Sequence, residues 1–99
     1  MPKGYLFAEI EVTDPEEFER YRAAVPATIA AYGGRYLVRG GASELIEGEP
    51  DKKLRTVVLE FPSRERLLEW YNSPEYKDPK ATRFRSTTTR AWIMTGTDE

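Results

Sequence analysis

The spacing of apolar residues changes from a strand period to a helix period twice along this chain, and that order limits the fold more than any other feature. From residue 5 to 12 apolar side chains occupy every second position, the period of a strand with one buried face. From Phe18 to Tyr32 they recur every three or four positions, the period of a helix with one apolar stripe. The second half repeats this order, and a last strand pattern at residues 91–94 closes the chain. The sequence therefore predicts the element order β-α-β-β-α-β.

The first predicted helix has recognisable ends. Asp14 can cap it, Pro15 suits its first position, and Glu17 can complete a capping box. Gly33 and Gly34 can adopt the left-handed conformation that ends a helix. Pro26 lies inside the pattern and has no amide proton, so we expect the helix to kink or restart there.

Two strand patterns follow the first helix. The earlier one, residues 35–39, stops at Gly40 and Gly41, and we expect it to resume at residues 43–46 after a bulge or bend. A turn at residues 48–51 leads to the later one, Leu54 to Phe61, whose β-branched middle predicts a central strand.

The second helical region contains two prolines in the same local context. Ser63 can cap its first helix. Ser73-Pro74 and Asp78-Pro79 then each place a capping residue before a proline, which is a helix-start pattern. We therefore expect two or three short helical pieces here rather than one rod.

This element order is typical of an α+β, ferredoxin-like fold, with a four-stranded antiparallel sheet and the helices on one face. The 99 residues contain no Ser/Gly/Pro-rich break, so we expect a single domain over residues 1–99. The open sheet face would mix carboxylates with apolar side chains, and we expect it to be covered by a second copy of the chain. The alternative is an amphipathic surface with scattered aromatics. The residues expected on this open face are Phe7, Glu9, Glu11, Val58, Glu60 and one of Trp92 and Ile93.

Composition removes several classes of function. The 15 basic and 17 acidic residues give a net charge of −2, which provides no general attraction to nucleic acid or anionic lipid. The predicted third strand lacks the aromatic signature of RNA-recognition domains, and no apolar run is long enough to span a membrane. Histidine and cysteine are absent, which excludes histidine- or thiolate-based catalysis and the commonest metal ligands. We expect a cytoplasmic protein without a metal or cofactor.

Three residues of the first half are candidates for a site between sheet and helices. Arg39 precedes two glycines, and its guanidinium could grip a carboxylate or enolate; the alternative is an ion pair with Glu60 or Glu9. Tyr21 and Tyr32 lie on the apolar stripe of the first helix, where a tyrosine either packs in the core or presents its phenol to a ligand. As a catalytic residue, Tyr21 could donate to a developing oxyanion.

The segment Trp70 to Tyr76 carries the other candidates. Trp70, Ser73 and Tyr76 fall at intervals of three, so in a continuous helix they would share one side and form an aromatic wall with a hydroxyl in it. Ser73 and Tyr76 are then candidate catalytic residues and Trp70 a substrate-binding one. The alternative for Ser73 is a helix cap, and without histidine it has no partner that would activate it as a nucleophile.

Five segments together resemble a known family, over about Gly4 to Gly96. They are Tyr32-Gly33-Gly34-Arg35, Val38-Arg39-Gly40-Gly41, Glu47-Gly48, Glu60-Phe61-Pro62-Ser63 and Trp70-Tyr71-Asn72-Ser73-Pro74-Glu75-Tyr76. The set resembles the domain of unknown function 1330 family. That resemblance implies a dimeric α/β barrel, in which two ferredoxin-like units stack their sheets. It also implies a substrate-binding arginine in the last helix, which we match to Arg83, although residues 83–90 fit that helix only loosely.

Superfamily relatives include cofactor-free monooxygenases, lactone isomerases and haem enzymes, so the resemblance does not choose a function. We consider two hypotheses. The chain is a homodimeric, cofactor-free enzyme acting on a small acidic or enolisable metabolite, or it is a non-catalytic dimer that binds a small ligand or serves as a scaffold.

Overall fold

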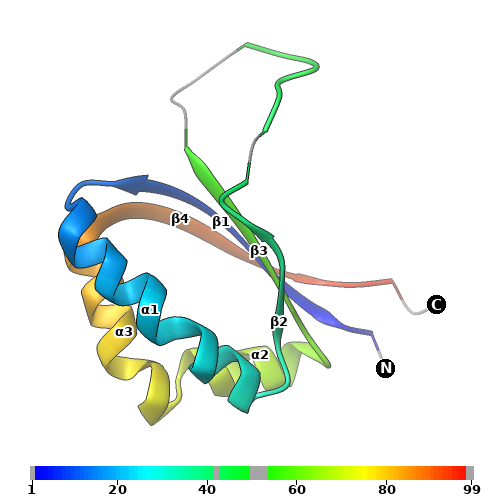
Figure 1. Cartoon of the computed structure of the whole chain (residues 1–99). Coiled ribbons are helices and arrows are strands. Elements are labelled where there is room, and N and C mark those ends of the chain that lie inside the picture. The colour runs from blue at the N-terminus through cyan, green and yellow to red at the C-terminus, as the bar shows by residue number, and fades with distance from the viewer. Residues whose placement is uncertain (1, 42, 50–53, 98–99) are drawn as a thin grey trace.

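The chain folds as one four-stranded antiparallel sheet with three helices on one face (Figure 1). The structure is a computed structural model that describes residues 2–41, 43–49 and 54–97. The strands lie in the order β2-β3-β1-β4, which is the ferredoxin-like arrangement. The elements are β1 (Gly4–Val12), α1 (Pro15–Ala31), β2 (Arg35–Arg39), β3 (Arg55–Phe61), α2 (Arg64–Tyr71), α3 (Pro74–Ser86) and β4 (Thr87–Thr95). The predicted α+β fold class is confirmed, with the second helical region divided into α2 and α3.

Strand β1 lies in the middle of the sheet, so its alternation determines both faces. Ala8 and Ile10 are buried against the helices, as the alternation predicts. On the other face, Phe7 is paired with Val58 of β3 and Trp92 of β4. The prediction had left open whether Trp92 or Ile93 faces outward. The register places Trp92 on the open face, while Ile93 packs against the core.

Helix α1 begins and ends where the sequence predicts. The Asp14 carboxylate accepts a hydrogen bond from the Glu17 amide at 3.2 Å, and Gly33 has a φ of 76° just past the helix end. The expected restart at Pro26 is wrong, because α1 continues through it from Pro15 to Ala31. Pro26 cannot donate to the carbonyl of Arg22, and the Nη2 of Arg39 donates to that carbonyl instead, at 2.9 Å.

Helices α2 and α3 are separated at Asn72 and Ser73. Ser63 caps α2 and Ser73 caps α3, each by accepting a hydrogen bond from the backbone amide three residues later. No further piece begins at Pro79, which lies inside α3. Pro79 deprives only the exposed Glu75 of an intrahelical partner for its carbonyl, so the helix can continue at modest cost.

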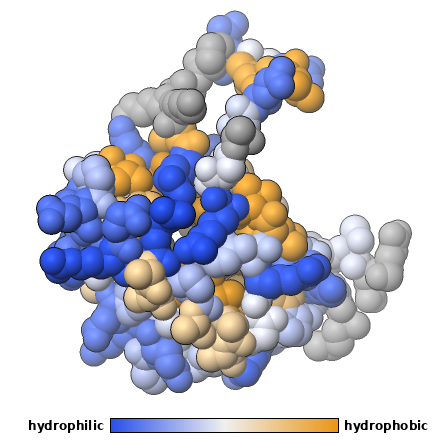
Figure 2. Space-filling view, viewed as in Figure 1, coloured by the Kyte–Doolittle hydropathy of each residue, from blue (hydrophilic) through white to orange (hydrophobic). Residues whose placement is uncertain are grey.

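The strand boundaries correct the prediction in two places. Residues 43–46 form no strand; they belong to a connection that projects beyond the sheet, and Ile46 in it is 92 % exposed. The surface near the end of this projection includes an apolar patch (Figure 2). Of the predicted turn, Gly48 has a φ of 98°, whereas Pro50 and Asp51 lie outside the described residues. Strand β4 is longer than predicted, because its threonine-rich first half pairs with β1 as far as Val12.

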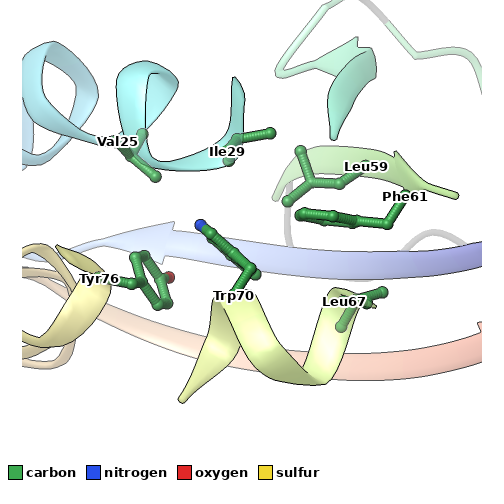
Figure 3. Packing of buried hydrophobic residues seen from close by; sticks show 7 residues of the cluster. All are labelled: Val25, Ile29, Leu59, Phe61, Leu67, Trp70 and Tyr76. Atoms are coloured by element: carbon green, nitrogen blue, oxygen red, sulfur yellow. The ribbon is translucent and has the colours of Figure 1, made fainter. Parts of the chain in front are cut away.

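The core lies between the sheet and the helices, and Trp70 and Tyr76 are at its centre (Figure 3). Trp70 is 1 % exposed, its ring stacks on that of Tyr76 with centroids 4.1 Å apart, and its Nε1 donates to the Thr28 hydroxyl of α1 at 3.0 Å. These contacts join α1, α2 and α3 into one layer over the sheet. No helix in the described part of the chain is long and apolar enough to cross a membrane.

Candidate functional site

A cavity lies between the helix face of the sheet and helices α1 and α3. Its volume, measured as the space open to the centre of a water molecule, is about 40 Å³. One water needs roughly 10–15 Å³ on the same measure, so the cavity is larger than a site for a single water. Apolar side chains of β1 and β3, among them Leu6, Ala8, Val57 and Leu59, form its floor. The helices and strand ends add aromatic rings and arginines.

Two tyrosine hydroxyls meet at the cavity wall. The Tyr21 and Tyr76 hydroxyl oxygens are 2.9 Å apart, so one donates to the other. Burial raises the pKa of Tyr21 well above its usual value of 10.0, and the neighbouring Tyr76 raises it further. Tyr21 is therefore protonated at neutral pH. The pair keeps one hydroxyl proton free to donate to a ligand oxygen.

Arg83 is the most deeply buried charge of the site. It lies seven residues after Tyr76, on the same side of α3, and only 7 % of its surface is exposed. Its Nε has no hydrogen-bond partner. Burial lowers the pKa of Arg83, but the adjacent tyrosines, Tyr76 first, outweigh this and raise its pKa above the usual value of an arginine. The guanidinium is thus charged beside the two tyrosine hydroxyls.

Arg39 lines the cavity from the edge strand β2. Its guanidinium lies over the Tyr36 ring, 4.6 Å from the centroid, and its Nη2 is held by the Arg22 carbonyl. The expected alternative, an ion pair with Glu60 or Glu9, is wrong. On the opposite face of the sheet, Glu60 binds Arg35 at 2.8 Å and Glu9 binds Arg90 at 2.7 Å.

Two cavity-lining arginines were not among the predicted site residues. Arg22 of α1 lies beside Tyr21, and its Nη1 pairs with Glu19 at 3.1 Å. Arg55 opens β3, and its guanidinium lies 5.5 Å from the centre of the Phe18 ring. The signal for Arg55 was in the sequence, because the inward positions of β3 continue back from Leu59 through Val57 to this arginine. A charge on an inward strand position indicates a site.

The cavity carries an unbalanced positive charge. Arg22, Arg39, Arg55 and Arg83 all line it, whereas no Asp or Glu does among the residues that the structure describes. Within those residues, three buried side-chain nitrogens or oxygens lack a hydrogen-bond partner, and they are the Nε atoms of Arg22, Arg55 and Arg83. A buried N–H group without an acceptor is costly, so the arrangement favours a ligand that brings acceptor atoms and negative charge to the cavity.

Two predicted site residues lie away from the cavity lining. The Ser73 hydroxyl donates to the Trp70 carbonyl at 2.7 Å and accepts from the Tyr76 amide at 3.2 Å, so it is used as a helix cap. The Tyr32 hydroxyl donates to Glu75 at 2.9 Å, and this bond is the first cause of its raised pKa. The other five predicted residues line the cavity: Tyr21, Arg39, Trp70, Tyr76 and Arg83.

In the described part of the chain, no three Asp or Glu side chains are close enough together to hold a metal ion.

The resemblance inferred from the sequence is confirmed by a family model that matches residues 3–97 and is described as a domain of unknown function (DUF1330). The chain belongs to this family. No curated protein matches it in sequence.

Solved structures show the same fold at low sequence identity. RPA0582 of Rhodopseudomonas palustris, a protein of unknown function, has a TM-score of 0.78 at 14 % identity, covering 99 % of this chain and 85 % of its own. SnoaB of Streptomyces nogalater, a cofactor-independent oxygenase, has a TM-score of 0.65 at 13 % identity, covering 100 % and 97 %. Rv0793 of Mycobacterium tuberculosis has a TM-score of 0.57 at 22 % identity, covering 100 % and 98 %. These neighbours establish the ferredoxin-like fold of this chain and leave its chemistry open.

Proposed function

We propose that the chain is a cofactor-free enzyme that binds a small acidic or enolisable metabolite in the cavity and stabilises its anion. The observation that carries this proposal is the lining itself: four arginines and a pair of tyrosine hydroxyls, with no carboxylate among the described lining residues. Such a lining favours a negatively charged ligand over its neutral form, and therefore lowers the pKa of a bound enol or phenol.

The roles follow from what each group can donate. The hydroxyl pair of Tyr21 and Tyr76 donates a hydrogen bond to the enolate oxygen, and Arg83 beside it balances the charge. Arg39, fixed by the Arg22 carbonyl, binds a carboxylate of the same ligand with its remaining N–H groups. Trp70 stacks on Tyr76 and keeps that ring in position.

The reaction that fits an enolate in this cavity is oxygenation by dioxygen. The substrate loses its proton to solvent, and the enolate carbon supplies the electrons for a new bond to dioxygen. Protonation of the terminal oxygen gives a hydroperoxide, which loses water to leave a ketone, so one oxygen atom enters the product and the other leaves as water. The similarity of the fold to SnoaB supports this choice.

A second candidate function is non-catalytic binding of a small organic anion. It is favoured by the absence of a proton acceptor: the lining arginines are charged, Tyr21 is protonated at neutral pH, and no carboxylate lines the described part of the cavity. In this case the same contacts bind a ligand without turnover.

Oxygen uptake separates the two candidates. Purified protein is mixed with a panel of small keto acids, 1,3-diketones and phenols, while dioxygen is followed by electrode and products by mass spectrometry. We expect uptake with at least one compound and a roughly 100-fold lower rate in Tyr76→Phe, the usual effect of losing an oxyanion donor. Tyr5→Phe removes a hydroxyl on the opposite sheet face and should not change the rate. Binding without uptake would contradict the enzyme proposal and support the second candidate.

We also propose that two copies pair through the open sheet face. Phe7 and Trp92 stack there at 5.5 Å, and Trp92 is 46 % exposed in the single chain. The ion pairs Glu9–Arg90 and Glu60–Arg35 are formed within the chain, so this surface can be covered without leaving their charges unbalanced. Light scattering at micromolar concentration should return twice the chain mass, and a monomer mass would refute the pairing.

A further inference from the structure

We propose that the cavity takes a ligand with two acidic groups, one bound by Arg83 and the tyrosine hydroxyls and the other by Arg39 and Arg55. This inference deepens the proposed function, since it rests on the same cavity as the substrate site. It goes further by naming the substrate class, a small dianion with a flat apolar middle.

The arginines form two groups at different places in the sheet. Arg83 lies in the last turn of α3, four residues before β4 begins. Arg39 and Arg55 come from β2 and β3, and the sheet order places β2 and β4 at opposite edges. On the helix face, Arg83 therefore approaches the cavity from the helix that leads into the β4 edge, whereas Arg39 and Arg55 approach it from the β2 edge and the neighbouring strand β3.

Arg39 and Arg55 lie next to each other. Arg39 is paired with Val57, and Arg55 is two residues before Val57, so both side chains are on the helix face. The Arg55 guanidinium also packs against the backbone of Gly40, the residue that follows Arg39. Two adjacent guanidiniums repel each other unless an anion lies between them. Of the three arginines at this end, Arg22 has Glu19, whereas Arg39 and Arg55 have no carboxylate partner among the described residues.

One anionic group would balance only one end. A ligand held by Arg83 leaves Arg55 with its Nε unpartnered, and a ligand held by Arg55 leaves the buried Arg83 in the same state. Between the ends, the floor formed by Leu6, Val57 and Leu59 is apolar, and Trp70 and Tyr36 add aromatic walls. A ring or short planar chain with an acidic group at each end matches this distribution.

The test compares benzoate with the three benzenedicarboxylates on the unmodified full chain. Binding is measured by isothermal titration calorimetry at constant ionic strength, so that screening is the same for singly and doubly charged ligands. We expect at least one benzenedicarboxylate to bind at least tenfold more tightly than benzoate. Equal affinities, or no binding by any of the four, would overturn the inference.

Substitutions locate the two ends. Arg55→Met should reduce the affinity of the preferred dicarboxylate to about that of benzoate, and Arg55→Lys should retain part of the advantage. Arg83→Met should have the same effect from the other end. Arg20→Met, an exposed arginine of α1 outside the cavity, should change neither affinity. If the dicarboxylate advantage survives in Arg55→Met, whose folding is checked by circular dichroism, the two-ended site is wrong.

The outcome can be told apart from that of the proposed function. A tenfold preference for a dicarboxylate without any dioxygen uptake would sustain the two-ended site and end the enzyme proposal. Turnover of a monoacid that depends on Tyr76, with equal binding of benzoate and dicarboxylates, would sustain the enzyme proposal and end the two-ended site.

Discussion

On the open face of the sheet, Glu9 binds Arg90 and Glu60 binds Arg35, whereas on the helix face Arg55 and Arg83 have no carboxylate partner among the described residues. Both faces belong to the same strands and both combine charges with aromatic rings. The difference is whether the charges are balanced within the chain. A surface whose charges are paired within the chain can be covered by a partner protein. A cavity whose positive charges lack such partners attracts ligands of opposite charge.

The largest expected effect is the loss of assembly in Trp92→Glu. Placing a carboxylate beside Phe7 adds an unbalanced charge to the open face and removes its stacked ring. Removing a buried interface tryptophan alone commonly costs about 2 kcal/mol or more. Light scattering should show the mass fall from dimer to monomer, while circular dichroism shows the fold retained. A dimer of unchanged stability would place the interface elsewhere.

Arg83→Met should separate stability from binding. The attraction that raises the pKa of Arg83 comes from ionised tyrosines, and Tyr21 is protonated at neutral pH, so at that pH the burial of the guanidinium is not fully offset. Replacing it by an apolar side chain of similar length removes this desolvation cost, so we expect the free energy of unfolding to rise by about 1–3 kcal/mol without ligand. Binding of organic anions should fall by more than tenfold. Urea unfolding and calorimetry measure the two effects. A loss of stability without ligand would mean that Arg83 is already compensated within the fold.

Its counterpart on the open face is Glu60→Gln, in which a balanced group is changed. Arg35 and Tyr5 then lose a charged acceptor, so the free energy of unfolding should fall slightly and anion binding should stay the same. If Arg83→Met and Glu60→Gln changed the free energy of unfolding in the same direction, the contrast between the two faces would be wrong.

Pro26→Ala should weaken anion binding while it stabilises the helix. The new amide N–H competes with Arg39 for the Arg22 carbonyl and releases the arginine from its fixed position. Removing a proline from a helix interior should add about 1–3 kcal/mol to the free energy of unfolding, and anion affinity should fall severalfold. Pro79→Ala in α3 is the matched control, because it should stabilise the chain without changing affinity. Equal affinities in both variants would exclude Pro26 as a positioning residue.

The smallest expected effect is a pH dependence that differs between the faces. The hydrogen bond from Arg35 lowers the pKa of Glu60 from its usual 4.5; burial opposes this, while the Tyr5 hydroxyl and the charges of Arg35 and Lys3 add smaller lowering contributions. The stabilisation from Glu60 is therefore present above pH 4.5 and is lost as the pH falls through its folded-state pKa. Urea unfolding from pH 7 to 3 should show a shallower loss in Glu60→Gln than in the unmodified chain.

On the cavity side we expect folding stability to be lost at alkaline pH rather than at acid pH. Burial raises the pKa of Tyr21 above 10.0, so its contribution is complete below that pH and disappears as the pH rises through the folded-state pKa. Tyr21→Phe should remove this loss of stability at alkaline pH and leave the loss of stability at acid pH unchanged. A smaller loss of stability at acid pH in Tyr21→Phe than in the unmodified chain would show that the two faces are coupled.

Several parts of the fold could be predicted because they depend on neighbours in sequence. The cap of Asp14 on the Glu17 amide, the glycine end of α1 and the serine caps of α2 and α3 are local interactions. The alternation of β1 likewise assigns side chains to two faces without knowledge of the partner strands. Tyr21, Trp70 and Tyr76 were expected near a pocket, and the structure places them around one cavity; their roles stay predictions.

The sequence by itself determined the element order, the helix caps and the two faces of the strands, because each depends on side chains a few residues apart. Only the tertiary structure decided that Trp92 rather than Ile93 faces outward, that Pro26 is tolerated because Arg39 binds the freed carbonyl, and that Arg55 shares a cavity with Arg83. These outcomes depend on strand register and on helix packing, which bring together residues far apart in the chain. A local pattern contains no information about which distant group will supply a missing partner.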